Sequence, residues 1–201
     1  MYKRQGTYNL TLNVSGAVGS ESYANKLDVL FVMDTSNSMM REMNSKNDLN
    51  DYTTNENSRF FNQQKAVEAA VAKLKSKKNV DAQFAVVSFD TEAGIETDWT
   101  NGKITYPSKV AKYNKSNNWD AGGTNYQAGL RKADELLKKG RTNATKIVVF
   151  LSDGDPTLYY DTDYLDKEYV DGSGSGYDSN AMAKAQTQLR TMSMNYFYTV
   201  G

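Results

Sequence analysis

The sequence predicts an α/β domain with a doubly wound, mainly parallel sheet and helices on both faces. Three observations support this fold class. Apolar runs at 27–32, 82–89 and 146–152 are too continuous for half-exposed strands and suit strands that are covered on both faces. Segments with helical spacing lie between these runs. Two of the strands also run directly into carboxylates, Asp34 and Asp153, as expected where a sheet ends at a ligand-binding edge.

The chain divides into a flank and a main domain. Residues 7–15 alternate apolar and polar side chains, which predicts a strand with one buried face ahead of the central strand. This strand does not fit the α/β alternation that follows it. We therefore assign residues 1–26 to an N-terminal β flank, or to the end of a preceding β-rich module, and residues 27–201 to the main domain.

Three helices are expected between the strands. Asn57-Ser58 can cap the first, and the Gly122-Gly123-Thr124 loop opens the second, which ends at Gly140. Ser179 can cap the third. The inward positions expected for the third helix are Met182, Ala185, Leu189 and Met192.

The remaining segments complete the predicted order. Residues 39–57 are polar and predict an irregular surface loop, and 95–100 predict a short edge strand. A short helix is expected near 108–113, after a proline. A long Tyr-, Asp- and Gly-rich insertion with a flexible Gly-Ser tip spans 156–178. Residues 195–200 predict the last strand.

Composition excludes several classes of function. The chain has 24 basic and 24 acidic residues, so no overall positive field attracts nucleic acid, and no segment is apolar enough for a membrane span. It has no cysteine and no histidine, which excludes disulfides, Cys/His zinc sites and Ser-His-Asp catalysis. We find no activated nucleophile, general base or phosphate-binding loop, so we expect no enzyme. The 151–178 region is locally acidic and should attract cations.

Oxygen-bearing side chains follow the predicted strands at three places. Asp34, Ser36 and Ser38 are spaced i, i+2 and i+4 past the central strand, Thr124 follows Gly-Gly, and Asp153 ends another strand. The strand ends of a doubly wound sheet lie together, so these groups could surround one hard cation such as Mg²⁺, Mn²⁺ or Ca²⁺. The alternative is structural, because serine and threonine also cap helices and aspartate also forms turns.

The motifs DTSNS (34–38), GGT (122–124) and SDG (152–154) resemble those of the von Willebrand factor A domain family. Its metal-ion-dependent adhesion site reads D-x-S-x-S, then Thr, then Asp. The resemblance implies a VWA/Rossmann-like fold in which Asp34, Ser36, Ser38, Thr124 and Asp153 bind Mg²⁺, or Mn²⁺ or Ca²⁺. Family members usually carry a further strand and helix after 195–200, and we expect these to be missing here.

The β flank followed by DVLFVMDTSNSM looks similar to the A modules of Gram-positive surface and pilus-tip adhesins. The resemblance implies an extracellular cell-surface or cell-wall module that binds a host matrix or cell-surface protein through a partner carboxylate. Two alternatives remain open. One is an intracellular A-domain subunit that docks to an ATP-driven assembly or chelatase machine, and the other is a metal-dependent hydrolase or phosphotransferase.

Overall fold

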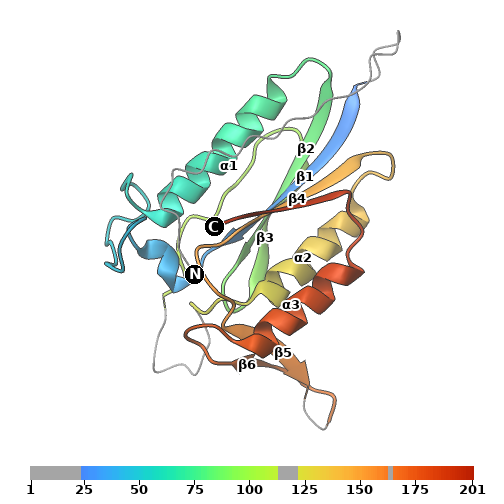
Figure 1. Cartoon of the computed structure of the whole chain (residues 1–201). Helices are drawn as coiled ribbons and strands as arrows, with labels where there is room; N and C mark the ends of the chain where they lie inside the picture. Colours follow the sequence, from blue (N-terminus) through green and yellow to red (C-terminus); the bar gives the residue numbers. More distant parts are fainter. Residues whose placement is uncertain (1–23, 113–121, 163–164) are drawn as a thin grey trace.

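The computed structural model describes residues 24–112, 122–162 and 165–201 and confirms the predicted fold class. A five-stranded sheet lies between α1 on one face and α2 and α3 on the other (Figure 1). The strand expected at 7–15 lies outside the described residues. Within the described part of the chain, no helix is long and apolar enough to cross a bilayer.

The strands of the sheet are ordered β3-β2-β1-β4-β7, and all neighbours are parallel except β2 and β3. Their bounds are β1 (Asn25–Asp34), β2 (Val80–Phe89), β3 (Ala93–Thr100), β4 (Thr145–Leu151) and β7 (Tyr196–Val200). The helices are α1 (Arg59–Lys75), α2 (Tyr126–Lys139) and α3 (Ser179–Thr191), with a short 3-10 helix η1 (Asn37–Met40). The predicted edge strand at 95–100 is confirmed as β3. The central strand starts at Asn25, inside the segment assigned to the flank.

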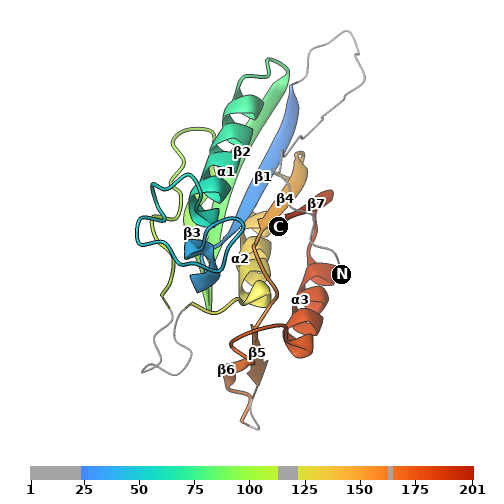
Figure 2. The same cartoon turned by 60° about the vertical axis from the view of Figure 1, so that its left-hand side comes forward.

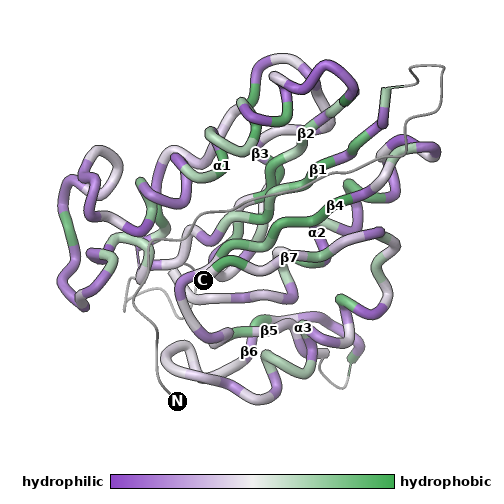
Figure 3. The backbone as a smooth tube through the Cα atoms, turned by 45° about the horizontal axis from the view of Figure 1, so that its top comes forward, coloured by the Kyte–Doolittle hydropathy of each residue, from purple (hydrophilic) through white to green (hydrophobic). Residues whose placement is uncertain are grey.

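Two apolar cores hold the helices on the sheet (Figures 2 and 3). Because side chains alternate along β1, Leu30 and Val32 face α2 and α3, whereas Val29 and Phe31 face α1. Val29, Leu30 and Val32 are fully buried and Phe31 nearly so. The apolar run of the central strand is therefore buried on both faces, as a doubly wound sheet requires.

Several local predictions are corrected. Ser58 caps α1 as expected, but Asn125 caps α2 in place of Thr124, and Asp178 caps α3 in place of Ser179. The third helix buries Ala181 and Ala185, whereas Met182 is only half-buried. The capping corrections move a helix boundary by a single residue, which is the usual uncertainty at helix ends. Ala185 and Met192 are buried as predicted, and Leu189 packs against the same core.

The prediction of a short helix near 108–113 is wrong for residues 108–112, which the structure describes and which are not helical. Val110 is buried in a small cluster with Met39, Met40 and Phe60, and the main-chain N–H of Ala111 donates to the carbonyl of Thr35 at 2.8 Å. These tertiary contacts hold the segment against the loop that follows β1.

The 156–178 insertion contains an ordered antiparallel hairpin, β5 (Leu158–Thr162) and β6 (Glu168–Gly172). It lies beside the first turns of α2 and α3 (Figures 1 and 2). Leu158 and Tyr159 are buried. The insertion is therefore anchored to the domain by the start of its first strand.

Candidate metal site

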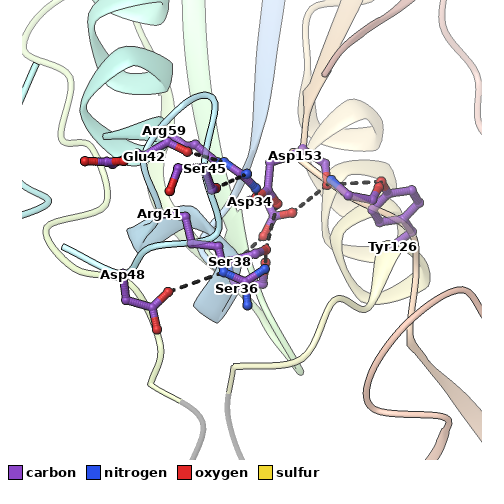
Figure 4. Close-up of polar contacts among 12 residues, drawn as sticks. Asp34, Ser36, Ser38, Arg41, Glu42, Ser45, Asp48, Arg59, Tyr126 and Asp153 are labelled. Carbon is purple, nitrogen blue, oxygen red and sulfur yellow. Dashed lines mark hydrogen bonds and ion pairs between the residues drawn. The ribbon is translucent and has the colours of Figure 1, made fainter. Parts of the chain in front are cut away.

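Four of the predicted site residues, Asp34, Ser36, Ser38 and Asp153, lie at the carboxyl ends of β1 and β4, an edge that we call the rim (Figure 4). β1 is the first strand of the described residues and lies between β2 and β4 in the sheet. The strand order therefore runs outward from β1 in both directions, to β2 on one side and to β4 on the other. Crevices at such a switch point are the usual ligand sites of open α/β sheets. The location predicted from the sequence is therefore the one that the fold provides.

Asp34 is the last residue of β1 and is fully buried. Its Oδ1 accepts a hydrogen bond from the Ser36 N–H at 2.7 Å, and its Oδ2 accepts one from the Ser152 hydroxyl at 2.5 Å. Burial, and after it the negative charge of Asp153, raise the pKa of Asp34 to about 7, whereas these hydrogen bonds favour the ionised form. Asp34 is thus a fixed carboxylate whose charge is poorly solvated.

Ser36, Ser38 and Asp153 form one connected set of oxygens. The hydroxyls of Ser36 and Ser38 lie 3.2 Å apart, and the Ser38 hydroxyl donates to Asp153 Oδ1 at 2.7 Å. Ser36 is buried and Ser38 is half-buried. The structure therefore brings together four of the five predicted residues.

Thr124 reaches the same rim through its loop. The Gly122 carbonyl accepts a hydrogen bond from the Asn37 N–H at 3.0 Å, which holds the Gly-Gly-Thr loop against DTSNS. Gly122 has a φ of 86°, which favours glycine, and a Cβ on Gly123 would lie 2.2 Å from Leu158 Cδ1, so a larger residue there would displace this buried side chain. Within the described residues, the Thr124 side chain has no hydrogen bond with the other four predicted ligands.

Three residues that sequence reasoning did not assign to the site also contact it. Arg59 pairs with Asp153 Oδ2, and Ser152 joins Asp34 to the Tyr126 hydroxyl, which donates to Ser152 Oγ at 3.0 Å. Burial raises the pKa of Tyr126, so its hydroxyl remains a donor. Ser152 stands beside Asp153 in the SDG motif and could have been suspected. Tyr126 recurs at helical spacing with Leu130, Ala133 and Leu137, which indicates a buried apolar position and no polar role, and no motif marks Arg59.

The donor set suits a hard divalent cation. In residues 24–112, 122–162 and 165–201, no group of three or more acidic side chains is placed to hold a metal. A cation at the rim would therefore be held by two carboxylates and by neutral hydroxyls, which is an all-oxygen set of the kind that Mg²⁺ and Ca²⁺ accept. A divalent charge would also relieve the repulsion between Asp34 and Asp153. On this chemistry the residues present fit the cation.

This fold and this oxygen-rich rim define a von Willebrand factor type A domain. The sequence profile of that family, described as von Willebrand factor type A domain, matches residues 29–155. The match covers more than half of the chain, so the chain belongs to this family. Among curated proteins, the comparison finds no significant match.

Solved structures of pilus proteins share the fold. The minor pilin PilB of Streptococcus sanguinis is 20% identical, with a TM-score of 0.61 over 88% of this chain and 50% of that chain. The pilus adhesin RrgA of Streptococcus pneumoniae is 19% identical, with a TM-score of 0.50 over 70% of this chain and 22% of that chain. The pilus adhesin SpaC of Lactobacillus rhamnosus GG is 15% identical, with a TM-score of 0.50 over 87% and 24%. This chain spans about half the length of PilB.

Proposed function

We propose that this domain is a divalent-cation-dependent adhesion module of a cell-surface or pilus protein. The observation that carries the proposal is the 2.7 Å hydrogen bond between Ser38 Oγ and Asp153 Oδ1, which joins two oxygen-bearing motifs 115 residues apart in the chain. Membership of the von Willebrand factor type A family and the similarity to pilus proteins support the same assignment.

The residues that would hold the cation are Asp34, Ser36, Ser38, Thr124 and Asp153. Mg²⁺ is the first choice among the hard cations, with Mn²⁺ or Ca²⁺ as alternatives. When bound, the cation supplies a Lewis-acidic position, and neutral hydroxyls leave its charge only partly compensated. A carboxylate on a partner is then the natural further ligand, so the ligand that we propose is a protein offering an Asp or Glu side chain.

The same reasoning gives the partner and the location. Two of the similar structures are described as pilus adhesins. We therefore place the domain outside the cell, at the surface or cell wall, with a host matrix or cell-surface protein as its partner. Its role is binding without catalysis.

The first test is titration calorimetry with MgCl₂ and MnCl₂. We expect the wild-type domain to bind one divalent ion and Asp34→Ala to lose measurable binding, because the substitution removes one of the two carboxylates. Asp155→Ala is the matched control, since Asp155 is exposed on the same turn as Asp153. The control should bind within about twofold of the wild type, since water around the exposed Asp155 side chain weakens its interaction with the site. Wild-type affinity in Asp34→Ala would contradict the proposal.

The second test concerns the partner. A panel of purified matrix proteins is immobilised and the domain is passed over it in Mg²⁺ and then in EDTA. We expect at least one protein to bind in Mg²⁺ only, and this binding to disappear in Asp34→Ala while persisting in Asp155→Ala. Equal binding in Mg²⁺ and EDTA would show that recognition does not use the cation.

A further inference from the structure

Arg59 connects three parts of the rim through one guanidinium group (Figure 4). It is the first residue of α1 and pairs with Asp153 Oδ2. Its Nε donates to the Glu42 carbonyl at 3.1 Å, and its Nη2 donates to the Ser45 carbonyl at 3.0 Å. Both carbonyls belong to residues 41–58, which we call the rim loop.

The ion pair is well shielded from solvent. The Arg59 side chain is 20% exposed and that of Asp153 is 10% exposed. Another rim-loop pair, Arg41 with Asp48 at 3.3 Å, has side chains that are 34% and 54% exposed. Charges that are withdrawn from water interact more strongly, so the charge of Arg59 influences Asp153 far more than the charge of Arg41 influences Asp48.

We propose that Arg59 is a positioning residue that acts as an internal counter-cation of Asp153 and thereby couples the rim loop to the cation site. The inference rests on the proposed function. Asp153 uses Oδ1 for Ser38 and Oδ2 for Arg59, so its charge is already partly neutralised by a group that stays protonated at all working pH values. The neighbouring positive charge of Arg59 therefore lowers the affinity with which the same carboxylate binds a divalent ion.

The coupling is reciprocal. If Arg59 lowers the affinity of the site for the cation, then the cation must weaken the hold of Arg59 on Asp153 by the same free energy. The hydrogen bonds from Arg59 to the carbonyls of Glu42 and Ser45 are then weakened as well. Cation binding at the rim therefore loosens residues 42–45, on the surface from which a partner approaches.

A merely structural role predicts the opposite sign. If Arg59 only supports the loop, its removal leaves cation affinity unchanged or lowers it through disorder at the rim. If it is a counter-cation, Arg59→Ala binds the cation about 5- to 50-fold more tightly, which lies within the usual range of coupling between sites. The direction of the change in affinity thus separates the two roles.

The experiment is calorimetry with MnCl₂ on four proteins at about 0.15 M ionic strength, where exposed charges are screened: the wild type, Arg59→Ala, Arg59→Lys and Arg41→Ala. We expect tighter binding by Arg59→Ala alone. Arg59→Lys keeps the charge and should stay within about threefold of the wild type, and Arg41→Ala, which removes an exposed rim-loop charge, within about twofold. Equal or weaker binding by Arg59→Ala overturns the inference and leaves the proposed function intact, whereas a wild type that binds no Mn²⁺ overturns both.

Amide hydrogen exchange on the wild type and the two Arg59 variants tests the coupling with a second readout. We expect faster exchange at residues 42–45 when Mn²⁺ is added, and no such increase in Arg59→Ala. Arg59→Lys should show fast exchange already without Mn²⁺, because one ammonium group cannot span Asp153 and both carbonyls. Slower or unchanged exchange in the wild type on adding Mn²⁺ overturns the inference.

Discussion

Ser152 is the residue that ties the buried carboxylate to the rest of the domain. Its hydroxyl donates to Asp34 Oδ2 at 2.5 Å and accepts from the Tyr126 hydroxyl at 3.0 Å. The Tyr126 hydroxyl also lies within hydrogen-bond distance of the Gly154 carbonyl. A chain of polar groups therefore runs from α2 across the turn after β4 to the end of β1, and it holds Asp34 in one orientation.

Removing this hydroxyl should destabilise the domain. Ser152→Ala leaves Asp34 Oδ2 without its donor at a fully buried position, which we expect to lower the free energy of unfolding by about 1–3 kcal/mol. Urea unfolding followed by circular dichroism, without divalent ions, measures the change. Ser76→Ala is the control, because Ser76 is an exposed residue at the end of α1, and its cost should stay within about 0.5 kcal/mol. Equal midpoints for both variants would contradict a supporting role for Ser152.

At the scale of elements, Gly129 sets how closely α2 approaches the sheet. A Cβ at this position would lie 3.0 Å from Phe89 Cδ1 and 3.2 Å from Val32 Cγ1, both on buried side chains of β2 and β1. Glycine weakens a helix, so its presence in the middle of α2 is explained by this close packing.

Gly129→Ala should therefore destabilise the domain although alanine is the better helix former. Overpacking costs about 1–3 kcal/mol and the gain in helix propensity is about 1 kcal/mol, so we expect a net loss of about 1 kcal/mol in the free energy of unfolding. Thermal and urea unfolding provide the measurement. Gly94→Ala in β3 is the control, because its nearest neighbour would be Ser88 Oγ at an ordinary 3.9 Å. A more stable Gly129→Ala would show that α2 can move away from the sheet without cost.

The elements also show what the sequence can and cannot predict. Buried runs and helical spacing were sufficient for β1, β2, β4 and the three helices, because their pattern depends on local periodicity. The hairpin β5–β6 was not predicted, because the sequence analysis treated 156–178 as one Tyr-, Asp- and Gly-rich insertion. The hairpin is anchored by burial of Leu158 and Tyr159, which is a tertiary contact. The prediction of a short helix after Pro107 was wrong because Val110 is buried in a tertiary cluster, which local sequence does not show.

The same distinction applies to the site. Asp34, Ser36, Ser38 and Asp153 were found from their spacing and from their position after strands, and the structure connects them. Whether they bind a cation with Thr124 stays a prediction. The contribution of Arg59 depends on how the rim loop folds back over α1, and no local pattern of sequence encodes that arrangement.

At the scale of the whole molecule, Arg141 joins the strands at the end of the sheet opposite the rim. Its Nε donates to Asp28 Oδ1 at 2.8 Å and its Nη1 to Asp81 Oδ2 at 2.9 Å, and its Nη2 donates to the carbonyls of Leu27 and Asp81. Asp28 is fully buried. One guanidinium group thus clamps β1 and β2 to the segment between α2 and β4.

Arg141→Ala should be among the most damaging substitutions in the domain. It leaves Asp28 as a buried charge without its cation, for which the expected cost is about 3–5 kcal/mol in the free energy of unfolding. Chemical denaturation measures it, with Lys132→Ala as the control because the Lys132–Glu135 pair lies on the exposed face of α2. A loss below about 1 kcal/mol for Arg141→Ala would indicate that water replaces the guanidinium group at Asp28.

The bond between Ser38 and Asp153 also has a consequence for how the protein matures. The two residues are separated by 115 positions, and the described chain between them includes α1, α2 and the three strands β2, β3 and β4. A ligand that requires both side chains cannot bind during synthesis until β4 has left the ribosome and has been inserted beside β1. The domain would then become able to bind its partner in a single late step, and incomplete chains would not bind it.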